Sequence, residues 1–222
     1  MARKMIITID GPAGAGKSTV SKLLARKLGY IYLDTGALYR ALAYKALKVQ
    51  IGLDNIIDLE NLCSSTNIVL KNINGQMKVY VDGEDVGDKI RTEAVGLTAS
   101  KISAFAVVRQ RLLYLQKEAG ARGGIVAEGR DMGSIVFPDA DYKFYLDADI
   151  SERIKRRHQE LLAKGSSSEL QAIKKDMIIR DRQDSEREIA PLKPISGSIV
   201  IDSTRLSVTE VVEQIILRLS DK

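Results

Sequence analysis

The sequence predicts an α/β fold of three layers: a central five-stranded parallel sheet between helices, with a small antiparallel β insertion and a helical lid. Five short apolar segments alternate with amphipathic helical patterns, which is typical of a parallel sheet covered on both faces. The first of these segments runs directly into a glycine-rich loop that opens a helix. Two stretches with a different pattern interrupt the alternation, and these predict the insertion and the lid.

The regular elements of the core can be placed in chain order. The first strand is expected over residues 5–9, where Met-Ile-Ile-Thr-Ile is apolar and rich in β-branched side chains. The first helix is expected over residues 17–28, because its apolar side chains recur at helical spacing up to a glycine. Ser207 and Glu210 form a capping box before the last helix, expected over residues 208–219. The remaining buried strands are expected over residues 30–33, 124–127, 142–146 and 198–201.

A β insertion is expected over about residues 65–90. Asn74-Gly75 and Asp82-Gly83 separate short apolar segments there, and both dipeptides favour the positive φ angles of hairpin turns. Residues 92–117 are expected to be mostly helical.

The charge-rich stretch over about residues 151–188 is expected to be helical, with a break at residues 165–168, and to form the lid. The whole chain, residues 1–222, is then one domain, since 222 residues are enough for a single core. Its core takes up about residues 1–64, 91–150 and 189–222.

Composition narrows the classes of function. Lysine and arginine total 34 against 29 aspartate and glutamate, and the formal charge of +5 suits an anionic ligand as well as a nucleic acid. The single cysteine, Cys63, excludes an internal disulfide, and the single histidine, His158, excludes a site with several histidine ligands. No apolar run reaches the ~18 residues of a membrane span. We expect a cytoplasmic monomer that binds neither membrane nor nucleic acid.

The glycine-rich loop matches the pattern G-x-x-x-x-G-K-[ST] at every fixed position. Its small residues leave the backbone N–H groups free to surround phosphate oxygens, and the positive end of the following helix faces the same anion. Lys17 adds a mobile charge near the β- and γ-phosphates, and the Ser18 hydroxyl is suited to bind Mg²⁺. The expected ATP-binding residues of this segment are Gly11, Pro12, Ala13, Gly14, Ala15, Gly16, Lys17, Ser18 and Thr19.

A phosphate-binding loop alone fits several classes of protein. GTPase switches carry Asp-x-x-Gly and Asn-Lys-x-Asp signatures, and neither occurs in this chain. Motors and helicases are normally longer. A small kinase is therefore favoured, with a nucleic-acid-dependent ATPase as the rival from another class.

Residues for a second, phosphate-accepting ligand follow two other strands. Thr35 and Arg40 come after the second predicted strand, and the loop Glu128–Gly133 comes after the third. Because ligands of doubly wound sheets bind beyond the carboxyl ends of the strands, these residues are expected to lie near the phosphate loop. Six arginines occupy the predicted lid, and we expect two or three of them to bind phosphate oxygens: Arg153, Arg156, Arg157, Arg180, Arg182 and Arg187.

Several of these segments together resemble the bacterial cytidylate kinases, a family of nucleoside monophosphate kinases with the P-loop NTPase fold. The resemblance rests on Ile9–Ser18, Leu33–Arg40, Glu128–Pro138, the segment Arg187–Leu192, and Ile201–Thr204, in the expected order over nearly the whole chain. It implies the transfer of the γ-phosphoryl group of ATP to CMP or dCMP with Mg²⁺. It also marks the β insertion as the part that binds the monophosphate.

The resemblance also implies roles for individual residues. The acceptor nucleotide would contact Thr35, Tyr39, Arg40, Ser100, Arg109, Arg130, Asp131, Arg180, Asp184 and Arg187, while Arg157 would contact ATP. The catalytic residues would be Lys17, Arg130, Arg180 and Arg187, and Ser18 would bind the metal. Of the acceptor residues, Ser100, Arg109 and Asp131 would meet the base, Arg130 and Arg187 the phosphate, and Asp184 the sugar.

The chemistry of the base supports part of this assignment. Cytosine has an amino donor at N4, and a carboxylate such as Asp131 can accept from it, whereas Arg109 and Ser100 can donate to N3 or O2. Uracil would leave buried polar groups unpaired, which costs about 1–3 kcal/mol per group. A different P-loop kinase, such as a shikimate kinase, remains the rival within the enzymes.

Overall fold

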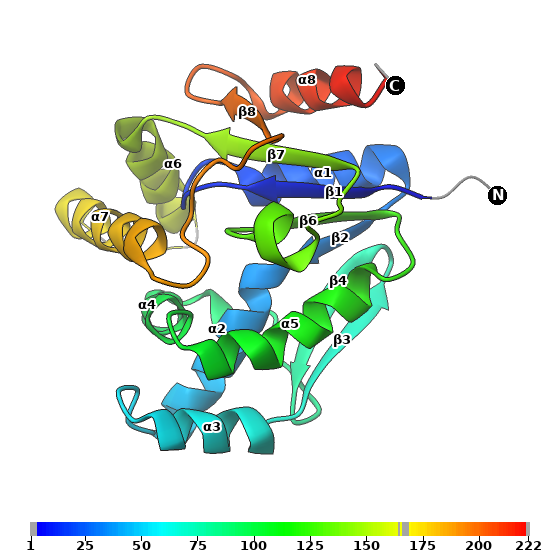
Figure 1. The fold of residues 1–222 in the computed structure, drawn as a ribbon. Coiled ribbons are helices and arrows are strands. Elements are labelled where there is room, and N and C mark those ends of the chain that lie inside the picture. The colour runs from blue at the N-terminus through cyan, green and yellow to red at the C-terminus, as the bar shows by residue number, and fades with distance from the viewer. Residues whose placement is uncertain (1–3, 164, 166–168, 221–222) are drawn as a thin grey trace.

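A computed structural model describes residues 4–163, 165 and 169–220 of the chain. Five parallel strands form the centre of its sheet, in the order β2–β6–β1–β7–β8 (Figure 1). The strands are β1 (Ile6–Asp10), β2 (Ile31–Asp34), β6 (Ile125–Gly129), β7 (Tyr142–Asp147) and β8 (Ile199–Asp202). Each lies within two residues of its predicted range, so the predicted five-stranded parallel sheet is confirmed.

Helices cover both faces of this sheet. Helices α1 (Lys17–Leu28) and α8 (Val208–Ser220) pack against one face through a core that includes Ile7, Leu24 and Val212. Helix α5 (Ala106–Gly120) and the π-helical turn η2 (Met132–Val136) pack against the other face, around Leu33 and Ala127. The three-layer architecture is therefore confirmed. None of the helices in the described ranges combines the length and apolar character that a bilayer crossing requires.

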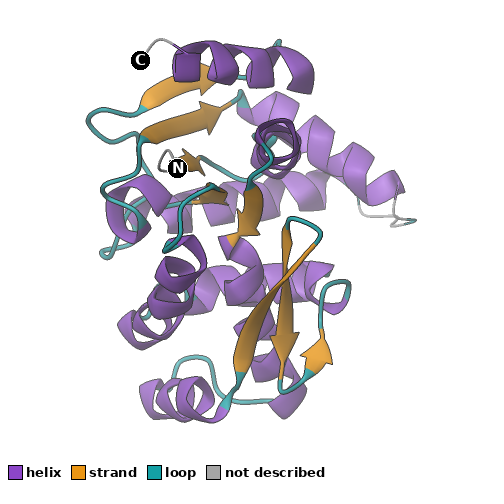
Figure 2. Cartoon of the chain, turned by 90° about the vertical axis from the view of Figure 1, so that its right-hand side faces the viewer, coloured by secondary structure: helices purple, strands orange, loops and turns teal. Residues whose placement is uncertain are grey.

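The predicted insertion is an antiparallel unit attached to the edge of the main sheet. It comprises β3 (Ile68–Ile73), β4 (Gln76–Val81) and the short β5 (Glu84–Asp85), and the 3₁₀ turn η1 (Lys89–Arg91) follows it. Both predicted turns have positive φ angles, for example 53° at Asn74 and 80° at Gly75. The β4 strand pairs with the main sheet where Gln76 lies opposite Tyr32 of β2, and the hairpin occupies the lower half of Figure 2.

The helices beside the insertion differ in part from the prediction. Residues 92–117 form two helices, α4 (Glu93–Ile102) and α5, because the chain leaves the helical path at residues 103–105. Two helices were not delimited from the sequence: α2 (Thr35–Val49), which packs on α4, and α3 (Ile56–Ser65).

The predicted lid is a pair of helices, α6 (Ile150–Ala163) and α7 (Leu170–Glu186), which pack on each other through a small apolar cluster that includes Ile154 and Met177. Both lie on the side toward which β1 and β7 run in Figure 1. Most of the predicted break at residues 165–168 falls outside the described residues; Gly165 has a φ of 76°. The two helices therefore stand at the carboxyl edge of the sheet, where ligands of this architecture bind.

Candidate active site

The phosphate loop connects β1 to α1 at the carboxyl edge of the sheet. Gly11 needs to be glycine, because its φ is 148° and an added Cβ would lie 2.0 Å from the carbonyl oxygen of Leu146. Gly16 precedes α1 in the left-handed conformation, and no side chain caps the amides of the first turn. These amides and the positive end of α1 are therefore available to an anion.

Lys17 lies at the floor of this loop. Its ammonium group donates to the carbonyl of Pro12 at 2.6 Å, and the side chain is buried. Burial, followed by the charge of the Arg130 guanidinium, lowers the pKa of Lys17 to about 7, against the opposing effect of Glu128. Among the described residues the ammonium group of Lys17 donates to a carbonyl and forms no ion pair with a carboxylate, so a bound anion would stabilise its charged form.

Two buried carboxylates lie beside the loop at the ends of β1 and β6. Asp10 accepts from the backbone N–H groups of Met132 and Gly133 at 2.8 and 2.9 Å, and burial raises its pKa to about 6. Glu128 accepts from the Tyr32 hydroxyl, and burial raises the pKa of Glu128 as well. Both carboxylates place negative charge close to Lys17 without forming an ion pair with it.

The amino end of α2 carries the first acceptor-side group. Asp34 caps the helix by accepting from Ala37 N at 3.0 Å, and it also binds Arg40 at 2.8 Å and Arg91 at 3.0 Å. Burial opposes ionisation of Asp34, but the two guanidinium groups keep its pKa below the ordinary value. The Thr35 hydroxyl donates to the carbonyl of Glu128 at 2.6 Å, which ties α2 to the end of β6.

A second acceptor-side group forms around Asp131. Its carboxylate is paired with Arg109 of α5, and both side chains are buried. The Arg109 guanidinium also donates to the carbonyl of Ser103 at 3.3 Å and lies 6.0 Å from the centre of the Tyr39 ring. Ser100 lies at the same end, but its hydroxyl donates to Gln183 of α7 at 2.8 Å.

The third group consists of arginines that line the cleft between the phosphate loop and the Arg109–Asp131 pair. Arg130 pairs with Asp184 of α7 at 2.7 Å. Arg180 is half-buried near Arg130, and burial, followed by the charge of Arg130, lowers the pKa of Arg180 to about 10. Buried nitrogens of Arg180 (Nε) and Arg187 (Nη2) have no hydrogen-bond partner in the described structure. Such unpaired buried donors indicate a place for an anion.

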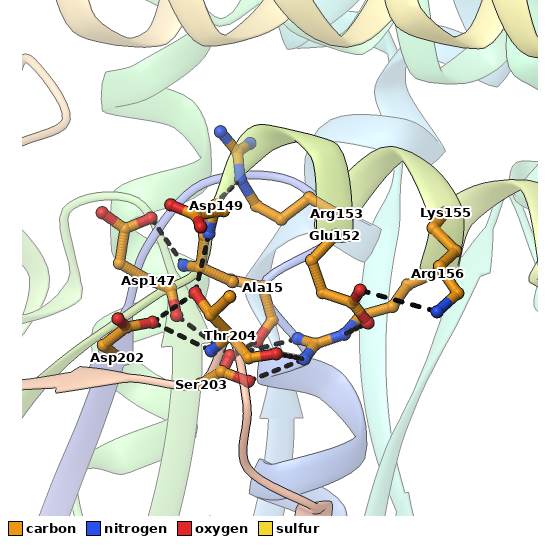
Figure 3. Close-up of polar contacts among 11 residues, drawn as sticks. Ala15, Asp147, Asp149, Glu152, Arg153, Lys155, Arg156, Asp202, Ser203 and Thr204 are labelled. Carbon is orange, nitrogen blue, oxygen red and sulfur yellow. Dashed lines mark hydrogen bonds and ion pairs between the residues drawn. The ribbon is translucent and has the colours of Figure 1, made fainter.

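The arginines of α6 support the phosphate loop rather than face an acceptor. Arg153 donates to the carbonyl of Ala13 at 3.1 Å and pairs with Asp181 of α7 at 2.6 Å. Arg156 donates to the carbonyl of Ser203 at 2.7 Å, and the Ser203 hydroxyl lies 3.1 Å from the carbonyl of Ala15 (Figure 3). The loop is thus braced from α6 and from the turn after β8.

The remaining two lid arginines form local helical pairs. Arg157 pairs with Glu160 at 2.8 Å and lies at the cleft, whereas the exposed Arg182 pairs with Glu186. Arg182 therefore belongs to the solvated face of α7.

One cleft of about 1230 Å³ joins these groups. It runs from the phosphate loop to α4, and β4 and Arg91 also line it. All the site residues predicted from the sequence line this cleft except Gly11 and Pro12, namely Ala13, Gly14, Ala15, Gly16, Lys17, Ser18, Thr19, Thr35, Tyr39, Arg40, Ser100, Arg109, Arg130, Asp131, Arg157, Arg180, Asp184 and Arg187. Gly11 and Pro12 support the loop from outside the cleft. Gly11 lies against Leu146 of β7, and the carbonyl of Pro12 accepts from Lys17.

Sequence reasoning missed several residues that build the site. Asp10, Arg91 and Ser203 were given no role in it, and Arg153 and Arg156 were expected only as possible phosphate ligands among six lid arginines, not as supports of the loop. Their contacts span large distances in the sequence, and most of them involve backbone groups, so no local spacing could have revealed them. Asp10 offered one signal, an acidic residue at the very end of a buried strand.

The donor set of the cleft fits Mg²⁺ bound together with a phosphate ligand. In the described residues no group of three or more His, Cys, Asp or Glu side chains could hold a metal ion. Mg²⁺ usually keeps several waters and takes one or two protein oxygens beside the phosphates, so it needs no such group. The exposed Ser18 at the start of α1 and the nearby carboxylate of Glu128 supply oxygens of that kind.

Comparisons with known proteins identify the family of this chain. The family model described as cytidylate kinase matches residues 7–221. A protein of Citrifermentans bemidjiense named cytidylate kinase is 48% identical over 94% of this chain and 90% of its own length, and one of Pasteurella multocida with the same name is 44% identical over 96% and 94%.

Among solved structures, an uncharacterized protein from Eubacterium ventriosum superposes with a TM-score of 0.56 over 99% of this chain and all of the other, at 11% identity. This likeness concerns the fold alone. The match of nearly the whole sequence, by contrast, confirms the resemblance found in the motifs: the chain belongs to the cytidylate kinase family.

Proposed function

We propose that this protein transfers the γ-phosphoryl group of ATP to CMP or dCMP and releases ADP with CDP or dCDP. The observation that carries the proposal is a single cleft with a phosphate loop at one end, a buried arginine–aspartate pair at the other, and unpaired guanidinium nitrogens between them. Family membership favours this reaction over a shikimate-type kinase and over a nucleic-acid-dependent ATPase.

The phosphate loop and α6 would bind the donor. Backbone amides at the start of α1 would face the phosphates and Lys17 would neutralise the β- and γ-oxygens, with Arg157, which also lines the cleft, beside them. Ser18 would hold Mg²⁺, which when bound neutralises phosphate charge and helps to align the phosphates.

The acceptor would lie with its base at Arg109 and Asp131 and its phosphate toward the phosphate loop. Asp131 can accept from the N4 amino group of cytosine, and Arg109 and Ser100 can donate to N3 or O2. Thr35, Tyr39 and Arg40 of α2 complete this half, with Asp184 for the sugar. The β insertion at about residues 65–90 contributes part of the wall through β4.

Catalysis would rest on alignment and charge. An acceptor phosphate oxygen is already ionised at neutral pH, so the reaction needs no strong general base. Arg130, Arg187 and Arg180 would hold the acceptor phosphate and the group in transfer between the two halves. The lid helices α6 and α7, about residues 151–188, would exclude the water that competes with the acceptor.

A coupled assay of ADP release with ATP and each nucleoside monophosphate tests the proposal. CMP and dCMP should be the best acceptors, with kcat/KM for UMP lower by about tenfold or more, because uracil leaves buried polar groups unpaired. Equal rates with all monophosphates, or turnover that responds only to RNA or DNA, would contradict it.

A further inference from the structure

The loop that carries Asp131 is the start of the short π-helical turn η2, and its first amides need partners. A helical turn leaves its first backbone N–H groups without partners inside the turn. Asp131 stands at the position before the turn, where an aspartate would normally accept from these amides. Yet the Asp131 carboxylate makes no capping hydrogen bond and is paired with Arg109 instead.

A residue from another strand takes over that task. Asp10, at the end of β1, accepts from Met132 N at 2.8 Å with one carboxylate oxygen and from Gly133 N at 2.9 Å with the other. Asp10 is 9% exposed and lies 121 positions before Asp131 in the chain, so this cap is a tertiary contact. The turn also lies tightly on β1, since a Cβ at Gly133 would be 3.1 Å from the Thr8 hydroxyl.

From this arrangement we infer that Asp10 is a positioning residue for acceptor specificity: by capping the turn after Asp131, it leaves the Asp131 carboxylate free to pair with Arg109 and to read the base. Without Asp10, the amides of Met132 and Gly133 would draw the Asp131 carboxylate into the cap and away from Arg109. The inference rests on the proposed function, because it assigns Asp131 to the base of the acceptor.

The same residue joins the two halves of the cleft. Asp10 immediately precedes Gly11 of the phosphate loop, while the amides that it binds immediately follow Arg130 and Asp131. One carboxylate therefore links the donor loop directly to the acceptor loop. β1 and β6 give that contact its register, since Asp10 pairs with Gly129 across the sheet.

The variants Asp10→Asn and Asp10→Ala test the inference. Asparagine keeps one acceptor oxygen but turns an NH₂ group toward an N–H donor, and alanine removes both acceptors. The ratio of kcat/KM for CMP to that for UMP should fall by about threefold in Asp10→Asn and by up to about tenfold, the effect expected of losing Asp131 itself, in Asp10→Ala, while KM for ATP changes less than about twofold. An unchanged ratio in a folded Asp10→Asn protein would overturn the inference.

Asp141 offers a matched control at the opposite end of the same strand. Its carboxylate accepts from Ile6 N at 2.8 Å, so Asp141→Asn makes the same chemical change to an aspartate that binds the backbone of β1. The CMP to UMP ratio should stay unchanged in that variant. An equal fall in both variants would show a general loss of stability and would contradict a special role of Asp10.

A double-mutant cycle separates positioning from plain structural support. If Asp10 acts through Asp131, then Asp10→Asn should lower the ratio no further once Asp131→Ala is present, whereas independent effects would multiply. Multiplying effects would overturn the inference. If wild-type protein showed no preference for CMP, the proposed function itself would fail. Hydrogen exchange at the Met132 and Gly133 amides, which should accelerate in Asp10→Asn but not in Asp141→Asn, would still test the cap.

Discussion

The two halves of the cleft are built by different means. The donor half presents backbone amides and the end of α1, with one buried lysine, and it is braced from behind by Arg153, Arg156 and Ser203. The acceptor half presents side chains that are already paired with one another: Arg40 with Asp34, Arg109 with Asp131, and Arg130 with Asp184.

Because of this difference, we expect the donor half to set the affinity for phosphate and the acceptor half to set which nucleotide is accepted. Backbone amides recognise any polyphosphate and tolerate changes of side chain except at residues such as Gly11, where space and φ forbid them. Ion pairs in the acceptor half have fixed donors and acceptors, so a ligand must match them or leave buried groups unpaired. Substitutions should therefore affect rate and donor affinity in one half and substrate ranking in the other.

The largest expected effect concerns the donor half. Lys17→Ala should lower kcat with CMP by about 10³-fold, because it removes the charge nearest the group in transfer. The coupled assay measures the loss, and circular dichroism should show an unchanged fold. Full activity in this variant would show that Lys17 takes no part in phosphoryl transfer.

A smaller effect is expected in the acceptor half. Asp131→Ala should reduce the preference for CMP over UMP by about tenfold, because the acceptor for the N4 amino group is lost. Arg182→Ala is the control, since Arg182 is exposed and pairs with Glu186 on the outer face of α7. The two substrate rankings should differ between the variants; identical rankings would argue against reading of the base by Asp131.

The brace behind the phosphate loop should have a more moderate effect. Arg153→Ala removes the donor to the carbonyl of Ala13 and the ion pair with Asp181, so the loop loses one of its anchors. KM for ATP should rise up to about tenfold, in line with one charge-assisted hydrogen bond, while KM for CMP changes little. Initial rates at varied ATP and CMP give both constants, and an equal rise in the two would show that α6 serves both halves alike.

The smallest effect is a proton taken up with ATP. The pKa of Lys17 is about 7 in the free protein, so at pH 8 most of the lysine is neutral, and bound phosphates favour its charged form. Binding at pH 8 should therefore take up close to one proton, and binding at pH 6 almost none from this group. Calorimetry in buffers of different ionisation enthalpy measures the uptake. Lys17→Met should abolish it, and the same uptake in that variant would assign the proton to another group.

Much of the fold could be predicted from the sequence because its signals are local. The five buried strands, the Asn-Gly and Asp-Gly turns and the capping box of Ser207 and Glu210 all lie where their residues indicated. The break at residues 103–105 could not be predicted in this way. Ser103, the first residue of the break, accepts from Arg109 through its carbonyl, and apolar periodicity does not register such a polar contact.

The candidate site was predicted where residues form a motif and missed where they act by contact. Lys17 and Asp131 belong to recognisable loops. Asp10, Arg153 and Ser203 act on backbone groups far along the chain, and a sequence does not say which carbonyl or amide will lie opposite a side chain. The pairing of arginines with carboxylates across the cleft likewise depends on how α7 packs against α4 and the sheet.

The central position of β1 limits how early the protein can fold during its synthesis on the ribosome. This strand is among the first segments to be synthesised, yet both of its neighbours, β6 and β7, lie in the second half of the chain. Gly11 lies against Leu146, and Asp10 accepts from the backbone amides of residues 132 and 133, all of which are synthesised much later. A nascent chain must therefore extend past β7 before the loop after β1 can take its final shape, so we expect any shorter growing fragment to bind ATP poorly.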